Sequence, residues 1–313
     1  MKDKIDRREF IKQSMAVGIT AALGTASLPS VLFGNSVAPQ IDISVVNGMD
    51  FYANTRKAVE MLGGMSTFVH EGSTVGLLIN SPFDKHGTYT NPDISIAVLK
   101  MCLEAGAKKI HSIEGASGKY WKRSNLYKSF ESDIARIQPK SDKTTVKIAK
   151  GKSLKEAEIS RSLLECDTFI NIPIVKNHEG TRFTANLKNF MGACSSSTNR
   201  FFHQGSGKGG LLRYFRYYDD IEFLSQCIAD VNSIRKPNLC IVDATEFITT
   251  NGPSGPGELK KAQKIVAGTN CVSVDAYCST LLGLQPDEVL MIRYASEHGI
   301  GEMDLKKLTI KEV

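Results

Sequence analysis

The chain has 313 residues, of which 42% are hydrophobic and 23% are charged, and its formal net charge is +6. This length is sufficient to bury a large core, either as one domain or as two interlocked lobes. The mild positive charge suits a small anionic ligand but is too weak to favour a nucleic-acid partner. No stretch is long and apolar enough to form a stable membrane span in the mature protein.

The N-terminal residues have the features of an export signal. Arg7 and Arg8 are followed by Glu-Phe-Ile-Lys, an order that resembles the twin-arginine export signal. Residues 15–33 are uncharged, but glycines and small polar residues lower the hydrophobicity of this stretch. Small residues that suit a cleavage site follow it. We therefore predict a signal peptide over 1–38, passage through the twin-arginine translocase to the periplasm, and one α/β domain over 39–313. The leader holds five Lys/Arg and three Asp/Glu, so its removal changes the formal charge from +6 to +4.

Strands and helices are expected to alternate along the rest of the chain. Apolar runs of strand length predict strands at 41–46, 75–79, 109–113, 145–148, 166–170, 238–242, 262–267 and 307–313. Helical spacing and capping residues predict helices near 54–62, 93–105, 127–137, 153–165, from 181 onward, and at 220–234, 273–282 and 287–297. This alternation predicts an α/β fold with a mostly parallel central sheet flanked by helices.

Seven cysteines are spread along the chain without a Cys-x-x-Cys pair. Most lie in apolar runs, where a free cysteine packs as a small hydrophobic side chain. This spacing argues against an iron–sulfur cluster and against a thiolate zinc site. The sequence leaves the identity of any other cofactor open.

The segment 171–192 carries the densest group of residues suited to chemistry. A buried strand ends at Pro173, because proline has no amide proton to give to a neighbouring strand. Lys176 and His178 follow two residues apart, so an extended chain places both side chains on one side. The end of a strand in an α/β protein is a common position for a binding site.

From Thr181 the spacing of polar residues is helical. It predicts Thr181, Thr184 and Lys188 on one helix face, with Asn189 beside them. A helix start offers free amide protons and a partial positive charge to an anion. We therefore predict a pocket for a small anionic molecule here. The alternative is a solvated loop that leads into an ordinary surface helix.

Loops after other predicted strands should meet the same edge of the sheet. His86 and Glu114 could therefore approach the segment 171–192, although single polar residues at such positions are usually ordinary loop residues. The long loop 194–218 is basic, aromatic and rich in glycine. It suits a lid over an anionic ligand, and equally a disordered or oligomer-contact loop.

Several short blocks of the sequence occur in a characteristic order. They are Thr90-Asn91-Pro92, Asn171-Ile172-Pro173 with Lys176 and His178, Thr184-Ala185-Asn186-Leu187-Lys188-Asn189 with Gly192, Val242-Asp243 with Asn251-Gly252-Pro253, and Val274-Asp275-Ala276. This ordered set resembles the bacterial and archaeal domain-of-unknown-function family numbered 362, over about residues 75–310. The family as a whole has no established reaction. Some relatives carry a ferredoxin-like cysteine segment, which this chain lacks.

Two departures from the family pattern concern the predicted site. Ile174 follows the strand-ending proline where the family often has lysine, and Thr249 stands where it often has glutamate. Glu246 is the nearby carboxylate that could substitute for that glutamate in a metal site.

These residues support a hypothesis of an exported enzyme that acts on a small anion. Lys176 and Lys188 would hold a carboxylate or phosphate, and His178 and Lys188 would be catalytic, with His178 as general acid and base. Further predicted ligand-binding residues are Thr181, Thr184, Asn189, Asn251 and Gly252. Asp243 and Asp275 would orient groups or share a divalent metal with His178. Two alternatives remain open: a non-catalytic protein that binds a solute or cofactor, and an accessory partner of a redox enzyme.

Overall fold

A central sheet of eight strands organises the computed structural model, which describes residues 40–203 and 220–313. Its strands lie in the order β12 (Ile310–Glu312), β1 (Ile43–Asn47), β11 (Leu259–Gly268), β10 (Leu239–Ile248), β7 (Thr168–Ile172), β2 (Thr74–Ile79), β3 (Lys109–Ser112) and β4 (Ile137–Gln138). Every pairing in the sheet is parallel except the two that β11 makes with β1 and β10. The predicted α/β class with a mostly parallel sheet is therefore confirmed.

Both faces of the sheet are buried, which explains why its inner strands are almost continuously apolar. In β7, Phe169 packs into the core on one face, whereas Ile170 and Ile172 pack into the core on the other. The neighbouring strand β2 alternates in the same way, with Leu78 on the first face and Leu77 on the second. The two cores follow from the period of two in an extended chain.

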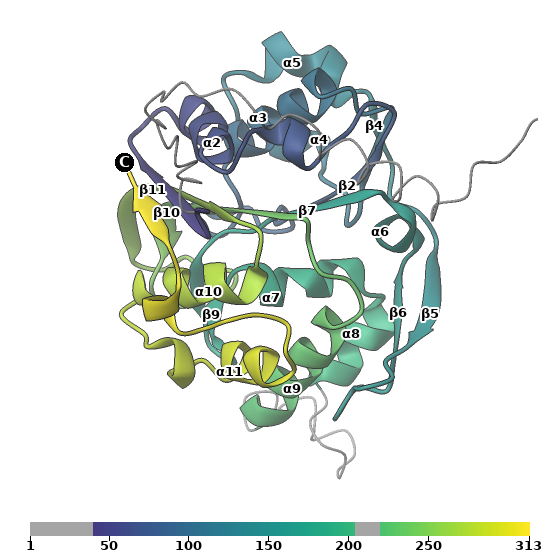
Figure 1. The fold of residues 1–313 in the computed structure, drawn as a ribbon, viewed down its shortest axis with the longest axis vertical. Helices are drawn as coiled ribbons and strands as arrows, with labels where there is room; N and C mark the ends of the chain where they lie inside the picture. The colour runs from purple at the N-terminus through teal and green to yellow at the C-terminus, as the bar shows by residue number, and fades with distance from the viewer. Residues whose placement is uncertain (1–39, 204–219) are drawn as a thin grey trace, which may run out of the picture. The chain divides into compact units, whose positions relative to one another are not determined.

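Helices cover the two faces in two groups (Figure 1). One face carries α2 (Phe51–Glu60), α3 (Pro92–Glu104), α4 (Gly118–Trp121) and α5 (Tyr127–Ile134). The other carries α7 (Asn186–Asn189), α8 (Ser196–His203), α9 (Ile221–Asn232), α10 (Cys271–Thr280) and α11 (Leu290–Glu297). None of the helices in the described ranges is long and apolar enough to span a bilayer.

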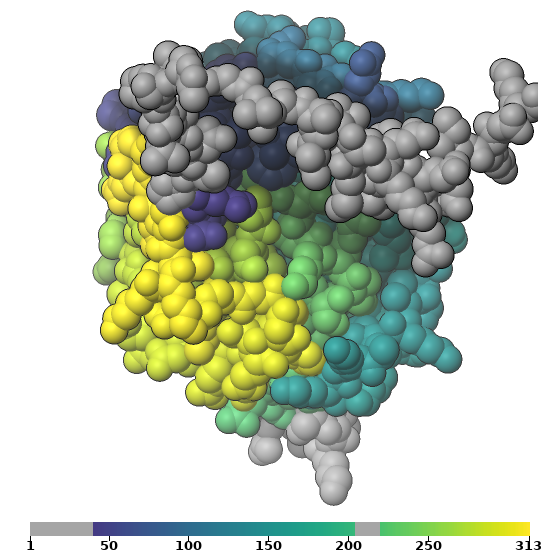
Figure 2. Space-filling view, viewed as in Figure 1, coloured from purple at the N-terminus to yellow at the C-terminus, as the bar shows by residue number. Residues whose placement is uncertain are grey.

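The first and last strands along the described chain, β1 and β12, are neighbours in the sheet and pair in parallel. In Figure 2 purple residues from the start of the described chain lie beside the yellow C-terminal segment. All seven cysteines are free thiols buried in the interior. Pro39–Val313 forms one compact unit, and the predicted signal peptide over 1–38 lies outside the described residues.

Two helices expected from the sequence are wrong in part. The stretch 153–165 contains a strand, β6 (Glu156–Ser160), paired with β5 (Lys143–Lys147), and only its end is helical, as α6 (Arg161–Glu165). Ser153 caps no helix, because the strand β6 follows it, and its amide donates instead to Asp230 of α9. The helix expected from residue 181 begins only at 186, and a short β-hairpin precedes it. In both places pairing with a second strand outweighs the local helical spacing.

Candidate functional site

A β-hairpin directly after the buried strand β7 presents the predicted site residues. It consists of β8 (Lys176–His178) and β9 (Arg182–Thr184), in antiparallel pairing. Lys176 lies directly opposite Thr184, and His178 is two residues further along the same strand. The extended chain therefore places Lys176 and His178 on one side, as their spacing predicts.

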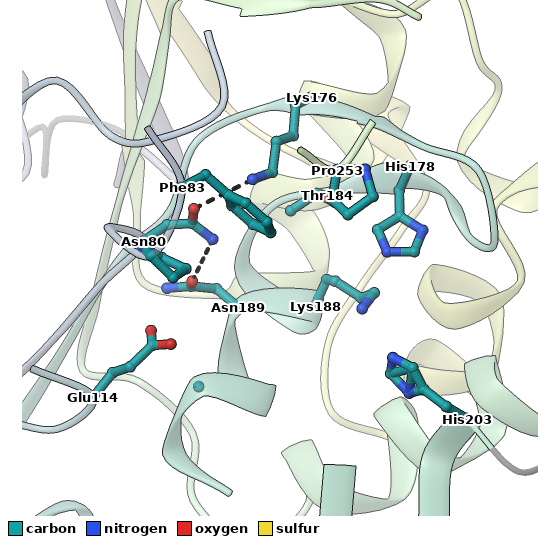
Figure 3. Close-up of a pocket in the computed structure, with 12 residues that line it drawn as sticks. Asn80, Phe83, Glu114, Lys176, His178, Thr184, Lys188, Asn189, His203 and Pro253 are labelled. Carbon is teal, nitrogen blue, oxygen red and sulfur yellow. Dashed lines mark hydrogen bonds between the residues drawn. The ribbon is translucent and has the colours of Figure 1, made fainter. Parts of the chain in front are cut away.

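The hairpin and the ends of neighbouring strands enclose a cavity of about 200 Å³ (Figure 3). Its lining residues come from the loops after β2 and β3, from the hairpin, from α7 and the turn after it, from the end of α8, and from the loop after β10. They are Asn80, Pro82, Phe83, Glu114, Lys176, His178, Thr184, Lys188, Asn189, Gly192, His203 and Pro253. The cavity thus lies at the carboxyl ends of parallel strands, where α/β sheets commonly bind ligands.

Lys176 is a buried cation without a carboxylate partner among the described residues. Its residue is 1% exposed, and its ammonium donates to Thr88 O at 2.5 Å and to Asn80 Oδ1 at 3.4 Å. The same nitrogen lies 4.2 Å from the ring centroid of Phe83. Burial, and secondarily the charge of Lys188, lower the pKa of Lys176 to about 7.

Lys188 lies on α7 and has even fewer partners. In the described part of the chain its ammonium has one hydrogen-bond partner, the Met191 sulfur at 3.1 Å. A thioether is a weak acceptor, so the charge is poorly compensated. Burial lowers the pKa of Lys188 to about 8.

His178 is held in a defined tautomer by the turn of the hairpin. Its Nδ1 accepts hydrogen bonds from the amides of Gly180 at 3.0 Å and Thr181 at 3.2 Å. The proton of the neutral ring is therefore on Nε2, which has no hydrogen-bond partner among the described residues. Burial, then the charges of Lys188 and Lys176, lower the pKa of His178 to about 2. The resting imidazole is thus a neutral hydrogen-bond donor, and not the general base with a pKa near neutrality that the sequence suggested.

Two more predicted residues line the cavity with different roles. The Thr184 hydroxyl is buried and has no hydrogen-bond partner in the part of the chain that the structure describes. Asn189 is fully engaged: its amide nitrogen donates to Leu78 O at 3.1 Å and to Asn171 Oδ1 at 2.7 Å, and its oxygen accepts from Asn80 at 2.9 Å. Asn189 therefore fixes the wall of the cavity, whereas Thr184 keeps a free polar group inside it.

Glu114 is the carboxylate of the described cavity lining. No hydrogen bond or ion pair to its side chain is found in the described residues. Burial raises its pKa to about 7, against the opposing effects of Lys143, Lys176 and Lys140. A Cβ atom on Gly192 would approach Glu114 Oε2 to 2.5 Å, so the glycine makes the room that this carboxylate occupies.

The position of Glu114 agrees with the expectation that loops after parallel strands converge. His86 does not reach this cavity; it pairs with Glu246 and lines a separate one of about 190 Å³. Sequence reasoning missed Asn80, Gly192 and His203. Asn80 directly follows β2, so its place at the strand end is the available signal. Gly192 belongs to one of the family blocks, but nothing there indicates a role in the cavity, and no local pattern marks His203.

The metal set predicted from His178, Asp243 and Asp275 is not assembled. Asp243 accepts hydrogen bonds from the Asn91 amide at the start of α3 and from Thr245. Asp275 accepts from two amides at the start of α7. Across 40–203 and 220–313, no group of three or more His, Cys, Asp or Glu side chains is arranged to hold a metal. The two aspartates anchor helix starts, and the start of α7 is thereby closed to an outside anion.

Three further predicted ligand-binding residues support the hairpin from outside the cavity. Thr181 donates from its hydroxyl to Phe183 O at 2.9 Å within the turn. Gly252 donates to Asn177 Oδ1 at 3.0 Å, and a Cβ atom there would lie 1.7 Å from Asn177 O. Asn251 is exposed and donates to Pro256 O at 3.2 Å. This loop therefore packs tightly on the hairpin and brings Pro253 to the cavity.

The expected lid over 194–218 lies mainly outside the described residues. Its first part is described and forms α8, whose last residue, His203, lines the cavity. Residues 204–219 are not described. The role of that loop stays a prediction.

Comparisons with known proteins identify relatives of the chain. Among curated proteins, the thylakoid-associated protein sll1697 of Synechocystis is 23% identical over 241 residues, which cover 75% of this chain and 70% of that protein. Among solved structures, the lactate racemase apoprotein of Thermoanaerobacterium thermosaccharolyticum shares 13% identity at a TM-score of 0.41, covering 77% of this chain and 57% of that one. A protein of Thermotoga maritima shares 18% identity at a TM-score of 0.37, covering 63% and 51%.

This chain therefore spans little more than half the length of either solved structure. A family model described as Domain of unknown function (DUF362) matches residues 75–280, which include nearly all of β2, the hairpin, α7 and the whole of α10. The chain belongs to the DUF362 family.

Proposed function

We propose that the cavity between the β8–β9 hairpin and α7 binds a small molecule that carries a carboxylate or phosphate group, and that the protein acts on it by acid–base chemistry. The observation that carries this proposal is the charge imbalance of the cavity. Two ammonium groups, on Lys176 and Lys188, face a described lining with a single carboxylate, Glu114. Buried cations without anionic partners are costly, and a bound anion would remove that cost.

The remaining free groups suit the same ligand. An anionic oxygen beside Lys188 could accept hydrogen bonds from His178 Nε2 and from the Thr184 hydroxyl, which is buried and has no partner within 40–203 and 220–313. Charge-assisted hydrogen bonds of this kind are about twice as strong as neutral ones. The donors converge from the hairpin and from α7, so they form a preorganised set.

Acid–base chemistry is supported by the lysines more than by the histidine. The pKa of Lys188 is about 8 and that of Lys176 is about 7, so a substantial fraction of these side chains is a neutral amine near neutral pH. A group with a pKa near the working pH is an effective proton carrier. His178 would mainly donate a hydrogen bond, and its pKa would rise when an anion binds beside it.

Calorimetric titration with sodium sulfate tests the proposal, because sulfate remains a dianion across the pH range of interest. We expect sulfate to bind the native protein near pH 6.5, and Lys188→Met to weaken binding by at least about tenfold. Lys119→Met, at an exposed lysine of α4, is the matched control and should bind normally. Equal binding by both variants would remove Lys188 from the site, and no binding to native protein would reject the proposal.

The second candidate, a non-catalytic solute-binding protein, is favoured by one observation. His178 commits its Nδ1 to two backbone amides and has a pKa of about 2, so it is not a ready base. Native mass spectrometry of the purified protein would identify a retained ligand, which is then incubated with fresh protein. A binding protein returns this ligand unchanged, whereas an enzyme converts it.

We also propose that the protein reaches the periplasm through the twin-arginine translocase, as the Arg7-Arg8 sequence suggests. Mass spectrometry of protein recovered from the periplasm should find a mature N-terminus near residue 39. Replacement of both arginines by lysine should hold the precursor in the cytoplasm. Unchanged export of that variant would exclude this route.

A further inference from the structure

The carboxylate of Glu114 occupies the end of the cavity away from the two histidines. Figure 3 shows Glu114 on one side of Asn80 and Asn189, with His178 and His203 on the other. The cavity therefore has an acceptor end and a donor end. A ligand that fills both ends must offer different groups to each.

Glu114 lacks a donor of its own. The structure records no hydrogen bond to its carboxylate within residues 40–203 and 220–313, although the side chain is half-buried. A carboxylate in such a place normally accepts several hydrogen bonds, so the oxygens of Glu114 are left for water or for a ligand. Both amide hydrogens of Asn189 are engaged, and the hydrogen bond recorded from the Asn80 amide goes to Asn189, so neither amide is recorded as a donor to Glu114.

The space around this carboxylate is kept open by Gly192. Any side chain at that position would place its Cβ atom 2.5 Å from Oε2 and 2.8 Å from the carboxyl carbon of Glu114. The backbone at Gly192 needs no positive φ, so the close approach to Glu114 is the visible reason for glycine. Gly192 thus leaves space for the Glu114 carboxylate, but no described residue donates a hydrogen bond to it.

We propose that Glu114 accepts a hydrogen bond from a hydroxyl group of the ligand, so that the ligand class of this cavity is a small hydroxylated carboxylate or phosphate. This inference rests on the proposed function, since the anionic group of the ligand is placed at Lys188, His178 and Thr184. A hydroxyl group fits better than an ammonium group, because Lys176 and Lys188 already place two cations in the cavity.

The charges that act on Glu114 come from three elements around it. Lys143 lies on β5, Lys176 on β8 and Lys140 in the loop before β5, and all three favour the ionised carboxylate against its burial. With a pKa of about 7, the carboxylate is mostly ionised at pH 8 and mostly protonated at pH 6. The preference for a hydroxyl should therefore be greater at pH 8, even where the lysines bind anions less well.

Matched ligand pairs test the inference by calorimetry at pH 6 and pH 8. Glycolate is compared with acetate, and 3-hydroxybutanoate with butanoate, so that the hydroxyl is offered at two distances from the carboxylate. In native protein we expect the hydroxylated member of at least one pair to bind about tenfold more tightly at pH 8, with a smaller ratio at pH 6. Dividing the two affinities cancels the effect of lysine titration.

Variants separate this inference from the binding proposal. Glu114→Leu should equalise the members of each pair while keeping or strengthening sulfate binding, because it removes the negative charge of the cavity. Glu114→Gln, which retains an acceptor oxygen, should keep part of the preference, and Glu156→Gln at an exposed position should change nothing. If sulfate binds but neither pair is distinguished by native protein, the role of Glu114 is rejected and the anion site stands. If neither sulfate nor any carboxylate binds, both proposals fail.

Discussion

Asp275 of α10 and Asn186 of α7 are joined by two hydrogen bonds, because Asp275 Oδ1 accepts from the Asn186 main-chain amide at 2.8 Å and from its side-chain amide at 2.9 Å. The other oxygen, Oδ2, accepts from the Leu187 amide at 2.9 Å. One carboxylate thus fixes the start of the short helix that carries Lys188 and Asn189. The cavity depends on a residue that does not line it.

Replacement of Asp275 should therefore cost stability and binding together. Asp275→Ala leaves three donors without their acceptor, and we expect a loss of at least about 3 kcal/mol in the free energy of unfolding. Asp275→Asn retains one acceptor oxygen and should cost less. Urea unfolding monitored by fluorescence measures both, with Asp287→Ala at an exposed position as control. A change of less than 1 kcal/mol in the alanine variant would contradict the anchoring role.

Lys188 should reduce the stability of the empty protein. Its pKa is lowered from 10.5 to about 8, so the folded chain disfavours the ammonium form and the unfolded chain binds more protons between these values. Stability should consequently rise as pH increases from about 8 to 10.5. Lys188→Met should remove that rise and stabilise the protein at pH 7 by about 1–3 kcal/mol. A destabilised variant at pH 7 would show that the ammonium has a stabilising partner.

The affinity for sulfate should fall as pH rises. Protonated Lys176 and Lys188 attract the anion, and they lose their protons as pH rises through about 7 and about 8 respectively. Ionisation of Glu114 over the same interval adds repulsion. We expect the dissociation constant to increase between pH 6 and pH 9, by up to about tenfold per pH unit for each ammonium group required. Titrations at fixed ionic strength measure this, and a flat profile would mean that neither lysine contacts the anion.

Gly192 and Glu114 should be energetically coupled. In Gly192→Ala the new methyl group would overlap the carboxylate, which lies at the end of a flexible side chain and must move, at an expected cost of about 1 kcal/mol. In a Glu114→Ala background the same substitution should cost about 1 kcal/mol less, because the obstacle is gone. A double-mutant cycle by chemical unfolding provides the coupling energy. Additive effects would show that another neighbour of Gly192 sets its cost.

His178 should stay neutral and protonated at Nε2 throughout the neutral range. Its pKa of about 2 favours the neutral ring, and the two amides that donate to Nδ1 favour the tautomer with the proton on Nε2. Nitrogen-15 NMR of the imidazole distinguishes the two tautomers and the charged ring. We expect no titration of His178 between pH 5 and pH 8 in ligand-free protein. A midpoint near 6.5 would mean that water reaches the ring freely.

Parts of this architecture could be predicted from the sequence because they depend on local periodicity. The alternation of strand-length apolar runs and capped helices indicated the α/β class, and the spacing of Lys176 and His178 placed both on one side of the chain. Helical spacing predicts Thr184 on a helix face, whereas Thr184 reaches the cavity because it pairs with Lys176 across a hairpin.

The remainder depends on contacts between distant segments. Asp243 binds the amide of Asn91, and Asp275 binds that of Asn186. Aspartates near a predicted site suggest a metal, and only the fold reveals that their oxygens are already occupied by backbone donors. The need for glycine at 192 likewise appears only when Glu114, from another strand end, is in place.

The seven buried cysteine thiols should react only in molecules that have unfolded, so their modification would report past unfolding. While the native packing holds, oxidants and alkylating reagents have no access to these groups. A molecule that opens in an oxidising medium acquires adducts or bridges that the native interior has no room for, and these prevent its return. The fraction of molecules with modified cysteines should therefore increase with the time that the protein spends unfolded.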